Sequence, residues 1–159
     1  MKLILEGRPD IRDVTNDDVL EAIEAMASPH GPTFVILEDD QRNYTQAAGT
    51  DGRYVIESRD VYGEGFTHWR AMRDGAGEGA ATIRYRQRCP KGKHPPRGCP
   101  LKVRAGEVFS LRDVETVLLE FLSSASRTEA LRWRDASADF GAAASDDDEI
   151  RDIMPGRHL

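Results

Sequence analysis

The stretch VFSLRDVETVLLEFLSSASRTEALRWRD, residues 108–135, carries the clearest structural pattern in this chain. Ser110 and Asp113 have the spacing of a helix N-cap, in which a hydroxyl accepts from an otherwise unpaired backbone N–H group. Leu131 and Trp133, two residues apart after a polar break, predict a short extended segment that lays the indole on the core. Between the cap and Leu131, apolar residues recur at helical spacing, and they predict a helix with one face packed on a sheet. These residues are Val114, Val117, Leu118, Phe121 and Leu122.

A second capped helix is predicted near the N-terminus. Thr15-Asn16-Asp17-Asp18 repeats the cap pattern, and its acidic residues suit the positive end of a helix dipole. Val19, Ile23 and Met26 follow at helical spacing, so they predict one buried stripe. Pro29 marks the end of this helix.

The middle of the chain predicts an antiparallel sheet. Residues 34–37, FVIL, are continuously apolar, which is typical of a strand covered on both faces. Residues 44–48, 53–59 and 66–72 predict further strands separated by polar or glycine-containing turns. Residues 3–5 predict either a first strand or a packed arm. We therefore predict an α+β fold: a mainly antiparallel sheet of about five to six strands with two principal helices packed on it.

Residues 80–106 have a strongly one-sided charge. The segment contributes eight positive charges and no negative charge, whereas the whole chain has a net charge of −6. The rest of the chain therefore holds fourteen more acidic than basic residues. A molecule polarised in this way can steer its encounter with a charged partner. The segment contains no acid and eight basic residues, which are Arg84, Arg86, Arg88, Lys91, Lys93, Arg97, Lys102 and Arg104.

The same segment predicts a β-hairpin with strands over residues 82–87 and 101–105. Apolar and basic residues alternate in both strands, so the basic side chains share the outward face. Pairing Tyr85 with Val103 sets a register. That register places Arg84 opposite Arg104, Arg86 opposite Lys102 and Cys89 opposite Cys99. Like charges directly opposite one another destabilise a strand pair, which indicates either good solvation or an anionic partner.

Three interpretations of this basic surface are open: a solvated arginine face, a protein-binding surface and a nucleic-acid contact. Nucleic acid is disfavoured because the face lacks interleaved aromatic residues and the acidic remainder repels phosphates. The residues predicted from charge geometry to bind a partner are Arg84, Arg86, Arg88, Lys102 and Arg104.

The predicted hairpin tip contains Cys89, His94 and Cys99, which are residue types that bind zinc. A structural zinc site needs four ligands, so another residue such as His68 would have to complete it. A disulfide between the two cysteines is the second possibility, although a reducing compartment disfavours it. The favoured interpretation is a pair of reduced cysteines, and no metal or cofactor is predicted.

No common catalytic motif is present, whether the GxSxG, HExxH, P-loop or paired CxxC type. Residues 75–80, GAGEGA, match a relaxed dinucleotide-binding loop, but an alternating strand follows instead of the helix that such a loop needs. Glu38, Asp39 and Asp40 predict an acidic turn after a buried strand. The sequence therefore predicts a protein without enzymatic activity.

The chain length of 159 residues predicts one domain, over residues 1–135, followed by an Ala/Asp-rich tail over 136–159. Within the tail, residues 145–149 either cap a short helix that carries Ile150, Ile153 and Met154 or belong to a disordered acidic segment. The apolar run at the N-terminus is shorter than the core of a signal peptide, and no segment approaches the roughly 20 apolar residues that span a bilayer. We expect a cytoplasmic location.

The C-terminal pattern of a turn, SLxDV, an amphipathic helix ending in Phe121, a polar break and Leu-x-Trp-x-Asp resembles a known family. It is similar to bacterial immunity proteins of polymorphic toxin systems, closest to the immunity family that includes inhibitors of deaminase toxins. The resemblance covers residues 34–135 and is most specific at its C-terminal end, while the cysteine-containing hairpin and the tail depart from it.

This resemblance implies a protein that binds a cognate toxin domain and blocks its active site or its access to substrate. It supplies no binding residues, so the predicted contact face rests on charge alone. An acidic patch that covers a basic groove on a toxin is a second possible contact surface. The alternative function is a regulatory or nucleic-acid-binding module that uses the basic hairpin at residues 82–105.

Overall fold

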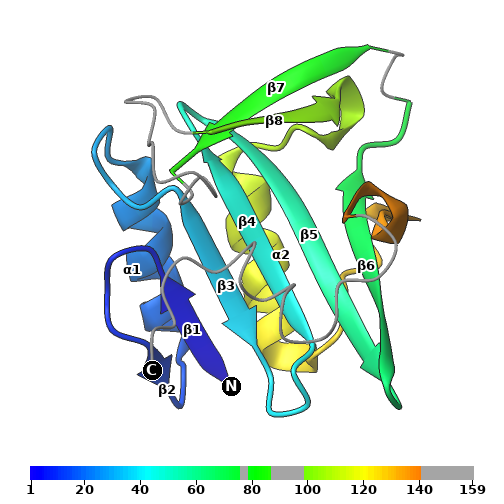
Figure 1. The fold of residues 1–159 in the computed structure, drawn as a ribbon. Helices are drawn as coiled ribbons and strands as arrows, with labels where there is room; N and C mark the ends of the chain where they lie inside the picture. The colour runs from blue at the N-terminus through cyan, green and yellow to red at the C-terminus, as the bar shows by residue number, and fades with distance from the viewer. Residues whose placement is uncertain (76–78, 87–98, 141–159) are drawn as a thin grey trace.

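The structure, a computed structural model, describes residues 1–75, 79–86 and 99–140. Figure 1 shows a central antiparallel sheet with two helices behind it and a two-stranded hairpin across its other face. The strands of the central sheet lie in the order β2-β1-β3-β4-β5-β6-β9. Their bounds are β1 Lys2–Leu5, β2 Ile11–Arg12, β3 Phe34–Glu38, β4 Tyr44–Thr50, β5 Arg53–Tyr62, β6 Gly65–Met72 and β9 Arg132–Asp135. The predicted α+β class is confirmed, with seven strands in this sheet where five to six were expected.

Both predicted helices form, and both begin with the predicted cap. Helix α1 spans Asn16–Ala27 and helix α2 spans Leu111–Ser124. Thr15 Oγ1 accepts from the Asp18 N–H group, and Ser110 Oγ accepts in the same way from Asp113, each at 3.3 Å. The two aspartate side chains return a bond to the backbone N–H of the cap residue, which completes a capping box at each helix.

The main core lies between the two helices and one face of the central sheet. The predicted helix stripes supply it, because Val19 and Met26 of α1 and Leu118 and Phe121 of α2 are buried. Trp133 of β9 packs against the same core, as its spacing predicted, and its indole Nε1 donates to the Thr128 carbonyl at 2.9 Å.

A second, smaller core lies on the opposite face of the sheet. There a separate two-stranded sheet, β7 (Ala80–Tyr85) and β8 (Cys99–Arg104), covers β3, β4 and β5. Ile83 and Val103 point inward from the hairpin and are buried, which confirms the predicted alternation. They meet Phe34, Ile36, Tyr44, Ala48 and Val55 of the central sheet.

The predicted hairpin register is wrong. Tyr85 lies opposite Cys99, four residues from the expected partner Val103. A shift by an even number of residues keeps every side chain on its own face, so the alternation that fixed the faces could not fix the register. The basic residues therefore avoid one another: Arg84 lies opposite Pro100, Lys102 opposite Thr82 and Arg104 opposite Ala80.

The prediction that Cys89 lies opposite Cys99 depended on the expected register, and the structure contradicts that register. Cys89 lies outside the described residues, as do His94 and the rest of the predicted hairpin tip. The backbone of Cys99 belongs to β8 and pairs with Tyr85.

Packed structure continues beyond the predicted boundary at residue 135. Ala136 is fully buried, and its N–H group donates to the His68 carbonyl at 2.7 Å. A short 3-10 helix, η2 (Ser137–Phe140), then lies beside β6. The helix predicted to carry Ile150, Ile153 and Met154 lies outside the described residues. Within the described ranges, no helix is long and apolar enough to cross a membrane.

Candidate protein-binding surface

The outward face of the β7–β8 hairpin carries three exposed basic side chains. Arg84 comes from β7, and Lys102 and Arg104 come from β8. They alternate with the inward residues Ile83 and Val103, so they point away from the central sheet. No ion pair within the described part of the chain engages any of the three. We call Arg84, Lys102 and Arg104 the basic face.

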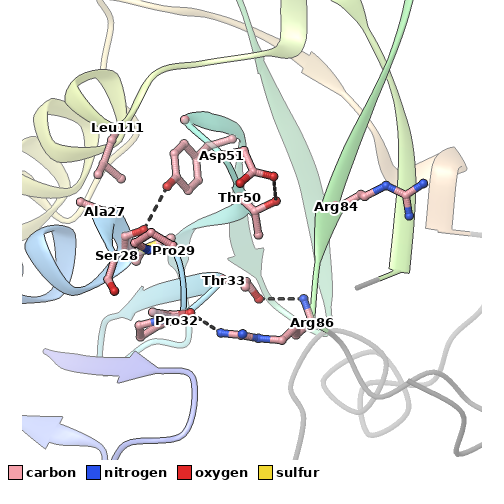
Figure 2. Close-up of a pocket in the computed structure, with 15 residues that line it drawn as sticks. Ala27, Ser28, Pro29, Pro32, Thr33, Thr50, Asp51, Arg84, Arg86 and Leu111 are labelled. Carbon is pink, nitrogen blue, oxygen red and sulfur yellow. Dashed lines mark hydrogen bonds between the residues drawn. The ribbon is translucent and has the colours of Figure 1, made fainter. Parts of the chain in front are cut away.

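Arg86 was predicted to belong to this face, but its side chain instead makes contacts with other residues of the same chain. Its guanidinium Nη2 donates to the Gly31 carbonyl, and its Nε lies 3.5 Å from Glu6 Oε1. Its backbone N–H donates to Thr33 Oγ1 at 2.8 Å, and Figure 2 shows both hydrogen bonds. Glu6 in turn accepts from the Thr33 N–H group at 2.6 Å. Arg86 therefore fastens the end of β7 to the loop between α1 and β3.

The other end of the hairpin is fastened by a buried acid. The short 3-10 helix η1 (Ala105–Glu107) follows β8 directly, and Glu107 is fully buried. Its Oε1 accepts from Arg134 Nε at 2.5 Å, and its Oε2 accepts from the Arg104 N–H group at 2.9 Å. These bonds hold the end of β8 to β9. The hairpin that carries the basic face is thus held at one end by the α1–β3 loop and at the other by β9, and such preorganisation lowers the entropic cost of binding.

Of the five predicted contact residues, the structure brings three together on one surface. Arg84, Lys102 and Arg104 form the basic face, and Arg86 has the internal role described above. Arg88 lies outside the described residues.

Sequence reasoning missed a buried polar network on the sheet face that carries the hairpin. Glu57 of β5 and Arg70 of β6 lie side by side, with Arg70 Nη2 2.6 Å from Glu57 Oε1. Gln46 of β4 donates to Glu57 Oε2 at 2.7 Å, and His68 Nε2 lies 3.5 Å from the same oxygen. All four side chains are buried. His68 Nδ1 also lies 3.4 Å from the hydroxyl of Tyr44.

The network continues toward the end of the described chain. Asp139 of η2 accepts from Arg70 Nη1 at 3.1 Å and from Arg134 Nη2 at 2.7 Å. Two arginines of neighbouring strands therefore converge on one half-exposed carboxylate. This contact ties η2 to β6 and β9.

The electrostatics of Glu57 fit a structural role. Burial alone would raise the pKa of its carboxyl group, but the neighbouring His68 and Arg70 lower that pKa to about 2. Both carboxylate oxygens are engaged by side chains of the network. A carboxylate with so low a pKa stays ionised at neutral pH, and it is not poised to exchange protons there.

Two hollows lie along the basic face. The larger, of about 770 Å³, lies between the α1–β3 loop, the β4–β5 turn and β7 (Figure 2). The smaller, of about 430 Å³, runs along β8, where Lys102 and Arg104 face Arg134 and Asp139. In the smaller hollow, the acids Glu107 and Asp139 already pair with Arg134, so no acid of the described residues compensates the charge of Lys102 and Arg104.

A metal centre finds no support in the part of the chain that is described, where no group of three or more His, Cys, Asp or Glu side chains converges. The proposed zinc ligands Cys89 and His94 lie outside that part. His68, the suggested fourth ligand, is instead buried beside Glu57 and Tyr44.

Comparison of the chain with protein-family models gives no match, and comparison with curated proteins gives none either.

Proposed function

We propose that this chain is a non-enzymatic immunity protein that binds a cognate bacterial toxin domain in the cytoplasm and neutralises it. The observation that carries the proposal is the basic face, whose three cations are exposed and free of ion pairs within the described chain. The resemblance of residues 34–135 to immunity proteins supplies the class of partner.

The arrangement of the basic face favours a protein partner. Its cations stand on a hairpin that is fastened at both ends, so a partner would meet a surface of fixed shape. Charge complementarity accelerates encounter and selects among partners, while affinity comes from a few buried anchors at the centre of an interface. An acidic surface beside the active site of a toxin would provide the matching charge.

The same surface is poorly suited to nucleic acid. Stacking platforms for bases need outward aromatic side chains, but Tyr85 of β7 packs toward the inner core. The net charge of −6 also means that phosphates would be repelled by most of the molecule. Nucleic-acid binding is therefore an outcome to be tested against the proposal.

A direct test first looks beside this gene for a large secreted protein with a toxin domain at its C-terminus, and then uses that domain as the candidate partner. We expect the full chain to bind that domain in calorimetry and to restore growth of cells that express it. Reversing the basic face with R84E, K102E and R104E together should weaken binding by about 100-fold or more, because like charges would then face each other.

The matched control reverses three other exposed arginines, with R12E, R53E and R112E together. This control has the same net charge as the first variant and leaves the basic face intact, so its affinity should stay close to that of the native chain. The proposal would be overturned if neither variant affected binding, or if no toxin domain bound. It would also be overturned by tight RNA or DNA binding at physiological salt, with a steep salt dependence that disappears in the basic-face variant.

A further inference from the structure

Arg59 of β5 is a buried cation on the sheet face that carries the hairpin, and its side chain is only 4% exposed. Its Nε and Nη2 both donate to the Arg42 carbonyl, at 3.2 and 2.8 Å. The guanidinium carbon also lies 4.6 Å from the centre of the Tyr44 ring and 5.8 Å from that of Phe66. These contacts engage one edge of the guanidinium, whereas Nη1 makes no hydrogen bond within the described chain.

No acid of the described residues neutralises Arg59. Glu57, on the same face of β5, pairs with Arg70 at 2.6 Å, and Glu38 pairs with Lys2 at 2.7 Å. A carbonyl group and aromatic rings stabilise a cation only in part. A buried charge is costly unless an opposite charge compensates it, so the burial of Arg59 calls for a counter-ion that the described residues do not supply.

The burial of Arg59 favours a counter-ion from the same chain, because a separate partner would first have to uncover the side chain. Outside the described residues, the acids are Glu78, Asp152 and the four consecutive residues 146–149, which we call the acidic run. Glu78 belongs to the short connection between Gly75 and Gly79, and the Gly79 carbonyl holds that connection to the Ala105 N–H group after β8. The acidic run is therefore the main remaining source of negative charge.

The last described element lies one strand away from Arg59. His68 of β6 is the cross-strand neighbour of Arg59, and its N–H group donates to Ser137 Oγ of η2 at 3.1 Å. Figure 1 shows η2 beside β6. Asp139 of η2 accepts from Arg70 at 3.1 Å, and the side chains of Arg70 and Arg59 share one face of the sheet. The described chain therefore ends on the face that holds Arg59.

The acidic run is also within reach of Arg59. It begins at Asp146, and the last described residue is Phe140. The residues between these two can span up to about 20 Å when extended. Neighbouring strands are only about 4.8 Å apart, so the chain is long enough to pass from η2 over β6 to β5.

We propose that the acidic run docks on the hairpin-side face of the sheet and supplies the carboxylate that pairs with Arg59 through Nη1. A hydrogen bond between two charged groups is about twice as strong as a neutral one, and this one would compensate a cation that is otherwise buried alone. The pairing also withdraws the acidic run from the basic face, where the same charges would compete with an acidic partner. This inference does not depend on the proposed function.

A double-mutant cycle in the full chain tests the pairing, with the unfolding equilibrium constant measured by urea denaturation. One variant neutralises the acidic run with D146N, D147N, D148N and E149Q together, and the other is R59Q. We expect neutralisation to raise the unfolding constant about tenfold when Arg59 is present, because the buried cation loses its counter-ion. In the R59Q background the same neutralisation should change the constant by less than about twofold, because no cation remains.

The matched control neutralises four exposed acids elsewhere, with D10N, D13N, E24Q and E129Q together. It changes the net charge by the same amount as neutralisation of the acidic run. Its effect on the unfolding constant should be small and equal in the native and R59Q backgrounds. Purely additive effects of R59Q and of neutralising the acidic run would refute the docking.

A second measurement keeps Arg59 intact and so does not depend on whether R59Q folds. In the ¹⁵N-labelled full chain, neutralising the acidic run should shift the Arg59 Nε signal and the amide signals of Arg42 and Asn43, whereas the control variant should leave them in place. No shift at these residues would contradict the docking. Inorganic phosphate is then titrated into the native chain. Saturable shifts of Arg59 with phosphate, without any effect of the acidic-run substitutions, would assign the site to an external anion and overturn the proposal.

Discussion

Arg70 Nη2 lies 2.6 Å from Glu57 Oε1 across the β5–β6 pair, and both side chains are almost completely buried. A buried ion pair adds little net stability by itself, because removing two charges from water is costly. Losing one partner is different, because the other charge then remains buried without compensation. Because Glu57 and Arg70 neutralise each other, the face of the sheet beneath the hairpin can hold charged residues at its centre.

Arg70→Gln should therefore lower the free energy of unfolding by about 3–5 kcal/mol. Urea denaturation monitored by circular dichroism measures this change. The control is Arg8→Gln, because Arg8 lies 3.7 Å from Glu21 at an exposed site. A surface pair of that kind contributes about 0–1 kcal/mol. Equal losses of unfolding free energy in the two variants would mean that removing a partner from the buried pair costs no more than removing one from the exposed pair.

Glu57 should make stability depend on pH in the acidic range. The pKa of its carboxyl group is about 2 in the folded chain, against an ordinary value of 4.5. Between these values the unfolded chain binds more protons, so stability is complete above about pH 4.5 and falls as the pH decreases toward 2. Unfolding free energies measured by urea titration between pH 7 and pH 2 should show this loss.

The comparison variant for that measurement is Glu57→Gln. It should be less stable at neutral pH and should show a shallower decline below pH 4.5, since one titrating group has been removed. Hydrogen bonds from Thr15 and Ser137 lower the pKa values of Asp18 and Asp135. Partial burial acts to raise the pKa of Asp113, but hydrogen bonds from Ser110 and the nearby Arg73 lower it overall. These three carboxyl groups should give the same pH dependence in both proteins. Identical pH profiles for the two proteins would contradict the assignment of Glu57.

Loss of the α2 cap should destabilise the chain measurably. Ser110→Ala removes the hydroxyl that accepts from the Asp113 N–H group, and we expect a loss of about 1 kcal/mol of unfolding free energy. Ser123→Ala serves as the control, because its hydroxyl only donates to the Glu120 carbonyl near the exposed end of the same helix. That substitution should change stability by less than about 0.5 kcal/mol.

Gly31→Ala should disturb the α1–β3 loop. An added Cβ atom would overlap the Ala25 carbonyl oxygen, and relief of the overlap should cost about 1–3 kcal/mol. Gly79→Ala is the matched control, because a Cβ atom there meets only the Ala105 side chain at an ordinary 3.6 Å. Thermal unfolding of the two variants should differ clearly. A similar midpoint for both would show that the loop adapts without cost.

The elements of this fold follow well from local sequence patterns. Capping residues such as Ser110 act on the nearest backbone groups, so their effect is readable within a few positions. The continuous apolar run at residues 34–37 correctly indicated a strand covered on both faces. The hairpin register was not readable, because alternation distinguishes inward from outward positions and nothing more.

The buried network was missed for a related reason. Glu57 and Arg70 lie on different strands, and polar residues in alternating strands usually face solvent. One signal was present in the sequence: Tyr54, Val55 and Ile56 are all apolar and lie on both faces of β5, so the charged residue that follows them also had to be covered. Arg86 carried no such signal, since its partners Glu6 and Gly31 are distant in sequence.

The alternation along β7 and β8 has a consequence for how this protein can diverge. Ile83 and Val103 face the inner core and tolerate little change, whereas Arg84, Lys102 and Arg104 face outward and contribute no packing to it. Substitutions at the outward positions should therefore alter the charge of the basic face with little effect on folding. The fold can accept a different set of outward residues there while the scaffold beneath them stays constant.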